Sequence, residues 1–359
     1  MKLRVGLIGL GQQWQSMHRP ALKMLGERFD VRAIYADVAK LAENAVIEFQ
    51  ADPVDGYQAM VHRDDIDAIL ILEPSWLKFL PAMAACQAGK AVYWGGDLDL
   101  DPQADGAFKR CVEDSGVAFM AGLPRRYAPA TLRLKELIAT HLGPPRLIFC
   151  HRRLDLESQS QPRRPSGRSP VMSGANGKRF QDPVRVMRTE LVELIDWSCY
   201  IVGDRPSHVS AMNLGSVDGE SSNEIMLDYE SLTMRFNRAD ESSSVTAQIS
   251  CGAYIPSRWQ EAIGFRPPAA MQVCCERGVA FIDLPGTLVW FDDAGRHQES
   301  LESESPIGEK MLGQFHRAVT SLVRNLCGLD DAYAAATILN AARQSDREGR
   351  RICLADRAI

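Results

Sequence analysis

The sequence contains no long uninterrupted apolar run. None of its hydrophobic stretches approaches the roughly 18 to 20 residues that a helix needs to cross a bilayer. Strand-like residues begin at Leu3, which leaves no room for a secretory signal peptide before them. We therefore expect a protein that has no membrane partner and works in the cytoplasm.

Cysteine and histidine lack the spacings that mark disulfide, redox or metal sites. The nine cysteines include no C-x-x-C pair and lie scattered through apolar stretches, as reduced core thiols do. The seven histidines show no ligand spacing. Asp97, Asp99 and Asp101 alternate along one segment, but without the glycine turn that a calcium loop needs. The sequence therefore predicts no metal.

An excess of positive charge is also missing. The formal net charge is −5 at pH 7, which argues against nucleic acid as a partner of the whole chain. Residues 151–190 depart from this balance, with nine basic residues against four acidic ones among many Pro, Ser and Gly. A loop of this length is usually either functional or poorly ordered. Anion binding and simple mobility both remain open for it.

The chain is long enough for two domains, because a single hydrophobic core usually stops growing at about 250 to 300 residues and this chain has 359. Residues 1–123 alternate short strand-like runs with longer helix-like segments, from LRVGLIGL to VAFMAGL. This alternation predicts an α/β domain with a doubly wound parallel sheet, covered by helices on both faces. One helix is expected to begin at Asp101–Pro102, an N-cap followed by proline.

Residues 124–359 have a different sequence pattern. Strand-like runs such as HVSAMNLGSV and SVTAQISCGAYI follow one another through glycine, proline and serine turns, without helices between them. This is typical of a mainly antiparallel sheet. Two helices near the end of the chain complete an α+β domain for substrate binding and oligomerisation. We expect the open sheet face to form a homodimer or homotetramer, since an exposed sheet needs cover.

A glycine turn follows the first predicted strand. Gly9 and Gly11 stand in VGLIGLGQQW, between that strand and the first helix, where such a pattern binds a dinucleotide. Gly9 permits the tight turn, and Gly11 lets backbone amides approach a pyrophosphate at the helix N-terminus. The third position of the G-x-G-x-x-G pattern is Trp14, so the close packing expected there must be achieved differently. A glycine turn that binds nothing is the alternative.

The second predicted strand ends near an acidic residue. Asp37 is placed to accept hydrogen bonds from a ribose hydroxyl, and no arginine follows directly to bind a 2′-phosphate. NAD is therefore favoured over NADP. The predicted cofactor-binding residues are Gly9, Gly11, Gln12, Trp14, Asp37, Pro74, Gly95 and Gly96.

In these motifs and their order the sequence resembles the Gfo/Idh/MocA family, the glucose-fructose oxidoreductase and inositol dehydrogenase group, over nearly its whole length. The matching segments are VGLIGLGQQW with HRPAL, YAD, DAILILEP, AACQAGKAV, RRYAPATLRLKELI, ELIDWSCYIVGDRP, ERGVAFIDLPGTL and AARQSDREGRRICL. The resemblance implies a Rossmann domain, an open-sheet domain, and a crevice between them for a sugar or a cyclitol.

The sequence departs from this family at the fifth strand. Relatives end that strand with Glu-Lys-Pro, whose lysine assists proton transfer at the substrate hydroxyl. The matching positions here are Gly95, Gly96 and Asp97, so the lysine is absent. Hydride transfer to or from a carbinol carbon needs a proton to join or leave the oxygen. Other groups must therefore move that proton, or the reaction is not performed.

Two further family positions are also replaced. The element Asp-x-x-x-His-x-x-Asp corresponds to Thr189, Glu193 and Asp196, so only its last aspartate remains. A histidine common after the fourth strand corresponds to Lys78. Both changes remove groups that handle protons in relatives.

The sequence offers three substitutes as catalytic residues. Lys78 follows the fourth strand at the sheet edge where α/β proteins bind ligands. Glu193 is a possible base if burial raises its pKa, although a salt bridge with Arg188 or the basic loop is the alternative. Tyr127 follows a pair of arginines after the strand that ends at Leu123. The predicted substrate contacts are Arg126, Asp97 and Asp196.

Two functions follow from this reading. The first is an NAD(P)-dependent oxidoreductase that acts on a sugar, a polyol or a related small molecule through a non-standard proton-transfer site. The second is a catalytically degenerate NAD-binding sensor or regulatory protein. A third, an NAD-using lyase or glycosidase, would need acid and base residues that the sequence does not place.

Overall fold

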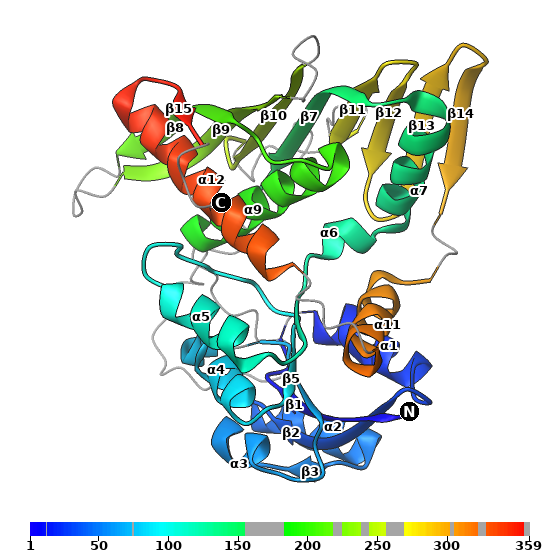
Figure 1. Ribbon diagram of the computed structural model, residues 1–359, viewed down its shortest axis with the longest axis vertical. Coiled ribbons are helices and arrows are strands. Elements are labelled where there is room, and N and C mark those ends of the chain that lie inside the picture. Colours follow the sequence, from blue (N-terminus) through cyan, green and yellow to red (C-terminus); the bar gives the residue numbers. More distant parts are fainter. Residues whose placement is uncertain are drawn as a thin grey trace, which may run out of the picture.

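The computed structural model describes residues 1–11, 13–73, 75–154, 183–217, 225–237, 244–255, 269–301, 305–321 and 328–354. These residues build two sheets, one at each end of the molecule (Figure 1). Within the described residues, no helix is both long and apolar enough to cross a membrane. Gln12, Pro74 and most of the basic segment, residues 155–182, lie outside the described residues.

The first sheet is parallel and doubly wound. Its described strands are β1 (Leu3–Ile8), β2 (Phe29–Tyr35), β3 (Asp52–Pro53), β4 (Ala68–Ile71), β5 (Ala91–Trp94) and β6 (Phe119–Ala121). They lie in the order β3-β2-β1-β4-β5-β6 and every pair is parallel. The chain order reverses beside β1, and dinucleotide-binding sheets hold their ligand at such a reversal. The predicted Rossmann domain is confirmed.

Helices cover both faces of this sheet because successive strand residues point to opposite sides. The N-terminal helical segments are η1 (Trp14–His18), α1 (Arg19–Met24), α2 (Ala39–Phe49), α3 (Tyr57–Val61), η2 (Ser75–Leu77), α4 (Leu80–Gln87) and α5 (Gly106–Ser115). Leu3, Val5 and Leu7 pack in one core with α1 and α2. The other face, with Ile69 and Val92, packs on α3, α4 and α5.

The expected start of one helix was wrong. The Asp101–Pro102 pair predicted a helix N-terminus, but α5 begins at Gly106. Asp101 instead caps a separate turn, where its carboxylate accepts a hydrogen bond from the Gln103 amide at 3.0 Å. Asp105 accepts one from the Asp101 amide at 2.7 Å. The capping chemistry was identified correctly, but it closes a turn that precedes the helix.

The second sheet is mixed and mostly antiparallel, as expected. Its described strands are β7 (Pro145–Arg153), β8 (His208–Val217), β9 (Ile225–Asn237), β10 (Ser244–Gly252), β11 (Met271–Cys275), β12 (Val279–Asp283), β13 (Thr287–Asp292), β14 (Gly295–Ser300) and β15 (Ile352–Cys353). Their order is β14-β13-β12-β11-β7-β10-β9-β8-β15, and only β7 and β10 pair in parallel among these described strands.

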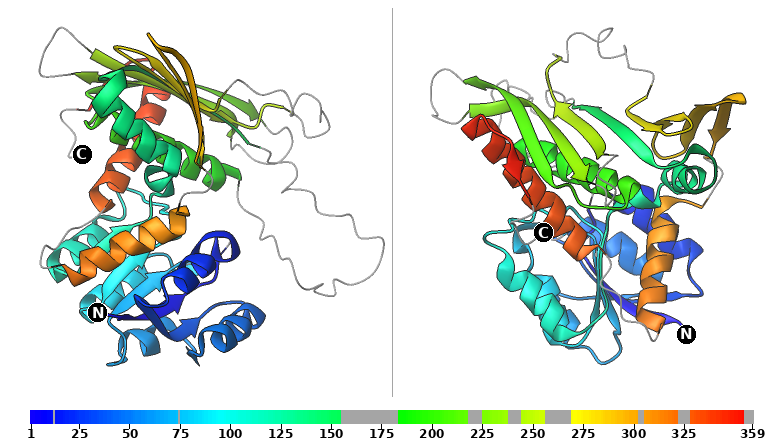
Figure 2. Two further views of the ribbon diagram at one scale, coloured as in Figure 1. Left: turned by 90° about the vertical axis from the view of Figure 1, so that its right-hand side faces the viewer. Right: turned by 45° about the horizontal axis from the view of Figure 1, so that its top comes forward.

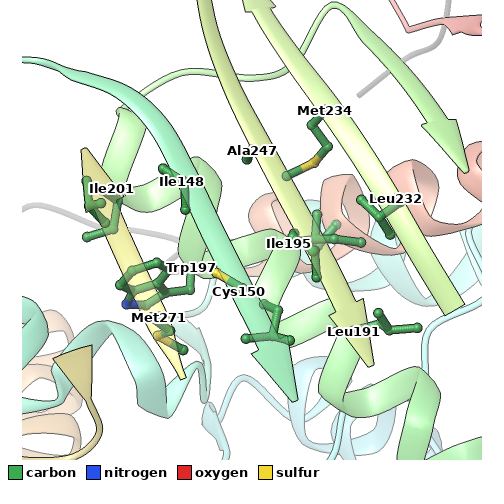
Figure 3. Packing of buried hydrophobic residues seen from close by; sticks show 14 of the residues in the cluster. Ile148, Cys150, Leu191, Ile195, Trp197, Ile201, Leu232, Met234, Ala247 and Met271 are labelled. Carbon is green, nitrogen blue, oxygen red and sulfur yellow. The ribbon is translucent and has the colours of Figure 1, made fainter. Parts of the chain in front are cut away.

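Helices cover one face of the second sheet. The remaining helical segments are α6 (Pro124–Tyr127), α7 (Pro129–Leu137), η3 (Ile138–Leu142), α9 (Pro183–Val202), α11 (Ile307–Thr320) and α12 (Leu329–Glu348). Helix α9 packs on β7 and β10, and α12 packs on β8. Figure 2 shows these helices between the sheet and the Rossmann domain. In Figure 3, Ile195 of α9 lies beside Ala247 of β10, and Trp197 lies beside Met271 of β11; all four are buried.

The two closing helices connect the domains. Met311, Leu312 and Phe315 of α11 belong to the same core as β1 and α1, so α11 packs on the Rossmann domain although it follows the second sheet in sequence (Figure 1). Helix α12 begins against β6 and runs along the second domain. The Tyr333 hydroxyl of α12 donates to the Asp105 carbonyl at 2.7 Å. Segments that are distant in sequence therefore build the junction between domains.

Candidate active site

The glycine turn follows β1 at the centre of the parallel sheet. Gly9 has φ +73°, a conformation that residues with a side chain rarely adopt. A Cβ at Gly9 would lie 1.9 Å from the Glu73 carbonyl oxygen, and one at Gly11 would lie 2.7 Å from the Glu73 Cβ. Only glycine fits either position. The turn thus passes close to the end of β4, at the edge where a dinucleotide binds.

Trp14, at the third glycine position of the pattern, places its side chain in the core. Its side chain is 2% exposed and its ring centroid lies 5.8 Å from that of Phe49, at the end of α2. The backbone from Trp14 to His18 forms a turn of π-helix before α1 begins. The indole therefore points into the core, and the wider turn gives it room. A cofactor at this turn would meet the Trp14 backbone rather than its buried indole.

Asp37 lies just beyond β2, on the same edge of the sheet. Its side chain is exposed, and its Oδ1 accepts a hydrogen bond from the Tyr35 hydroxyl at 3.3 Å. Burial and the nearby Asp37 charge raise the pKa of Tyr35. The carboxylate is thus oriented by Tyr35 and open to solvent, as a ribose ligand requires. The glycine turn and Asp37 together fit the phosphate and ribose parts of a dinucleotide.

The missing family glutamate is explained by a buried histidine. Gly95 follows β5, and a Cβ there would lie 2.6 Å from both His18 Nε2 and Tyr93 Cε1. His18 is fully buried, and its Nε2 lies 3.3 Å from the Tyr93 hydroxyl oxygen. Burial lowers the pKa of His18 to about 4, so the ring is neutral. His18 and Tyr93 occupy the space that a side chain at position 95 would need.

The loop after Gly95 is attached to α9. Trp94 Nε1 donates to the Asp97 carbonyl at 3.3 Å. Arg188 of α9 donates to the Leu100 carbonyl, and its Nε lies 3.4 Å from Asp99 Oδ1. Burial raises the pKa of the Asp97 carboxyl, and the charge of Arg185 opposes this rise. In the described part of the chain, no group of three His, Cys, Asp or Glu residues is arranged to hold a metal ion.

Glu193 lies in a charged cluster that joins α6 to α9. Arg125 donates from Nε to Glu193 at 2.7 Å and from Nη2 to Glu190 at 2.5 Å. Arg152 Nε lies 3.5 Å from Glu190. Burial raises the pKa of Glu193 above its ordinary value, while Arg125 opposes the shift. The Glu193 side chain keeps 22% of its surface exposed.

Arg126 and Asp196 form a second ion pair. Arg126 Nε donates to Asp196 Oδ2 at 2.8 Å, its Nη2 donates to Oδ1, and its Nη1 donates to Asp331 of α12 at 2.8 Å. The guanidinium also lies 5.1 Å from the Tyr200 ring centroid. Asp196 is 2% exposed. These contacts hold α6, α9 and α12 together, and the predicted contact of both residues with substrate stays a prediction.

The other two catalytic candidates lie at the Rossmann domain's edge. Lys78 follows η2, is exposed, and has φ +46°. Left-handed backbone at a residue with a side chain costs about 1 to 3 kcal/mol, and such strain gathers at functional sites. Tyr127 ends α6 and packs, half-buried, on the core that contains Tyr93. Their catalytic roles remain predictions, as does the role of half-buried Gly96 beside the cofactor.

Sequence reasoning missed two features of this site. It did not pair His18 with Gly95, which lie 77 positions apart and meet only across β1 and β5. It assigned Glu193 to Arg188 or to the basic loop, whereas the partner is Arg125. The adjacent arginines 125 and 126 were visible as candidates. The two adjacent arginines of PRRY and the two carboxylates three positions apart, Glu193 and Asp196, are the signal from which the two ion pairs could have been predicted.

Comparison with known proteins agrees with this geometry. Residues 3–94 match the GFO_IDH_MocA family, described as an oxidoreductase family with an NAD-binding Rossmann fold. A dehydrogenase from Aspergillus oryzae is 27% identical over 146 residues, 38% of this chain and 40% of that protein. An NADP(+) scyllo-inositol 2-dehydrogenase from Bacillus subtilis is 25% identical over 138 residues, 38% of this chain and 37% of that protein. The chain thus matches about two fifths of the length of these relatives.

The whole fold has counterparts among solved structures. The aldose-aldose oxidoreductase from Caulobacter crescentus, solved with glycerol, superposes with a TM-score of 0.74 at 15% identity, covering 99% of this chain and 100% of that one. This likeness concerns the arrangement of both domains, since the identity is low. The match of residues 3–94 to an NAD-binding Rossmann fold thus supports the predicted resemblance to the Gfo/Idh/MocA family.

Proposed function

We propose that the protein is an NAD(H)-dependent oxidoreductase that acts on a sugar, a polyol or a related small molecule. The observation that carries this proposal is the cradle formed by Gly9 and Gly11 against Glu73, with the exposed Asp37 on the same sheet edge. Bound NADH would supply hydride from its nicotinamide, and bound NAD⁺ would accept it there. The named relatives, a dehydrogenase and an inositol dehydrogenase, support the reaction class and the polyol substrate.

NAD is the proposed cofactor rather than NADP. The Asp37 carboxylate would accept hydrogen bonds from ribose hydroxyls and would repel a 2′-phosphate. Tyr35 fixes its Oδ1 from one side. The Bacillus subtilis relative carries NADP(+) in its name, so the preference rests on Asp37 alone. Cytoplasmic location and a homodimer or homotetramer built through the second sheet belong to the same proposal.

Glu193 is the best-supported candidate for the proton-transfer group. It stands at one of the family's proton-handling positions on α9, is partly exposed, and has a pKa that burial raises. A carboxyl with a raised pKa can hold and release a proton nearer neutral pH, which suits an acid or base for a substrate hydroxyl. Lys78 and Tyr127 are the other candidates, and Asp97 is proposed to contact substrate.

A turnover screen with NAD and NADH against polyols, sugars and uronates tests the proposal. Asp37→Ala is expected to weaken NAD affinity roughly tenfold or more, since hydrogen bonds to charged groups contribute about 1.5 to 3 kcal/mol. It should weaken NADP affinity less. Asp64→Ala removes an exposed aspartate that precedes β4 at the opposite sheet edge and serves as the matched control.

Glu193→Gln in the same screen tests proton transfer, because the amide keeps the side chain's shape but cannot exchange a proton at neutral pH. We expect kcat to fall by about 10²-fold or more with an unchanged dissociation constant for NAD. NAD binding without turnover of any substrate would exclude the oxidoreductase and leave a dinucleotide-binding protein. Failure of the wild-type protein to bind either nicotinamide cofactor would overturn the proposal entirely.

A further inference from the structure

A separate concavity of about 310 Å³ lies where α12 meets the loop after β5. Its lining residues are Asp101, Gln103, Arg188, Asn340, Arg343, Gln344 and Arg347. Three guanidinium groups and three side-chain amides thus surround one carboxylate. The volume is within the lower range of small-molecule sites. None of these residues belongs to the glycine turn or to the proposed proton-transfer groups, so this arginine pocket is a distinct site.

Hydrogen bonds and ion pairs with groups outside the lining hold two of the arginine side chains in place. Arg343 donates from Nε and Nη2 to Glu230, at 3.0 Å and 2.7 Å, and the Glu230 side chain is 3% exposed. Arg188 donates from Nη2 to the Leu100 carbonyl, with Asp99 3.4 Å from its Nε. In both arginines, these contacts use Nε and Nη2 and do not use the Nη1 group. Each guanidinium is therefore fixed in direction while it keeps N–H donors for another acceptor.

The third arginine completes the set of donors. Arg347 is exposed at the last turns of α12, and the amides of Gln103 and Asn340 add donors from two different elements. Preorganised guanidinium forks match the oxygen geometry of phosphate and carboxylate groups, and little side-chain entropy is lost when they bind. Asp101 is the one acidic group in the lining. Asp99 and Glu230 are not part of the lining, and they already contact Arg188 and Arg343.

We propose that the arginine pocket binds an oxyanion, the phosphate or carboxylate group of a small metabolite. Such a ligand would contact Gln103 in the loop of the Rossmann domain and Asn340 on α12 at the same time. It would therefore join the two domains at a second point, beside the Tyr333–Asp105 hydrogen bond. The site does not depend on the proposed oxidoreductase function.

Calorimetric titration of the full-length protein with pyrophosphate and, separately, with citrate tests the pocket and distinguishes its two ligand classes. Arg347→Gln removes one fork, and Asn340→Asp places a negative charge in the lining. Each is expected to weaken binding about tenfold or more, because a charge-assisted hydrogen bond contributes about 1.5 to 3 kcal/mol. Arg351→Gln, at an exposed arginine outside the lining, should bind like the wild type.

Hydrogen exchange locates the bound anion. Occupancy of the arginine pocket should slow exchange at residues 101–105 and 340–347 in the wild type and not in Arg347→Gln. Protection confined to residues 9–18 would place the anion at the glycine turn and would overturn the proposal. Equal affinity in all four proteins, or no saturable heat with either anion, would overturn it as well.

Discussion

His18 is a titratable residue whose burial sets its protonation state. It has no exposed surface, and among the described residues its Nδ1 has no hydrogen-bond partner. A protonated ring there would be an uncompensated buried charge, which explains why burial lowers its pKa to about 4. The neutral ring contacts Tyr93 and closes off the space beside Gly95. The His18 imidazole therefore fills the space beside the loop after β5 that a glutamate in place of Gly95 would need.

His18 makes stability depend on pH. The unfolded chain protonates this ring near its ordinary pKa of 6.5, whereas the folded chain does so only near 4. Its contribution is fully present above about pH 6.5 and falls by about 1.4 kcal/mol per pH unit as the pH drops toward 4, roughly 3 kcal/mol in all. Urea unfolding at pH 7.5, 6 and 5 should show a flatter pH dependence for His18→Gln than for the wild type.

An exposed histidine provides the control for this linkage. His62→Gln changes a surface ring at the end of α3 and should leave the pH dependence of unfolding as in the wild type. If His18→Gln and the wild type lose stability in parallel between pH 6.5 and 5, the ring is not neutral and buried as described.

Local chemistry made some residues of the site predictable. Gly9 and Asp37 could be placed at the ends of β1 and β2 because a turn and a strand end have signatures within a few positions, and their contact with a cofactor stays a prediction. The consequence of Gly95 was not predictable, because His18 reaches it from another βα unit. The missing lysine was visible in the sequence, but the side chains that fill the vacated space are set by packing across strands.

Among the helices, α6 is short but connects two long helices of the second domain. Its Arg125 and Arg126 connect to α9, and Arg126 also connects to α12 through Asp331. Asp196 is 2% exposed, so its charge depends on the Arg126 guanidinium for compensation. The four-residue helix α6 therefore forms an electrostatic junction, a set of ion pairs that holds α9 and α12 to α6.

Breaking this junction should destabilise the second domain. Arg126→Met leaves Asp196 buried without its partner, and we expect a loss of about 3 to 5 kcal/mol in the free energy of unfolding. The double variant Arg126→Met/Asp196→Leu should recover most of it, because no buried charge remains. Lys109→Met removes the more exposed Lys109–Asp330 pair between α5 and α12 and should cost at most about 1 kcal/mol. Denaturant unfolding of the three variants distinguishes these outcomes, and an equal loss in both single variants would contradict the assignment.

Element type was more predictable than element placement. The alternation of strands and helices in residues 1–123 gives the parallel sheet because βαβ units connect in one hand. The packing of α11 on that sheet could not be read from its own amphipathic pattern, which shows an apolar face but not its partner. The early helix start at Asp101 failed for a related reason: its side chain caps a turn that Arg188 of α9 helps to hold through Asp99 and Leu100.

At the scale of the whole molecule, the second sheet has one face covered by helices and one that the described helices leave open (Figure 2). The open face holds a concavity of about 580 Å³, whose lining includes Met212, Tyr229 and Phe281. Met212 is 76% exposed and Leu214 is 62% exposed. Apolar side chains on a broad sheet are typical of a surface that another protein covers. A second copy of this chain is the proposed partner.

Met212→Arg tests this assembly, because a charge on the open face should weaken a contact between two copies by tenfold or more. Light scattering at micromolar concentration should give at least twice the 39.8 kDa chain mass for the wild type and a lower average mass for the variant. Met24→Arg is the matched control, since Met24 is 71% exposed but lies on α1 of the Rossmann domain. A wild-type protein of single-chain mass would exclude the assembly, and an equal effect of both substitutions would place the contact elsewhere. Loss of assembly in Met212→Arg alone would assign the interface to the open face of the second sheet.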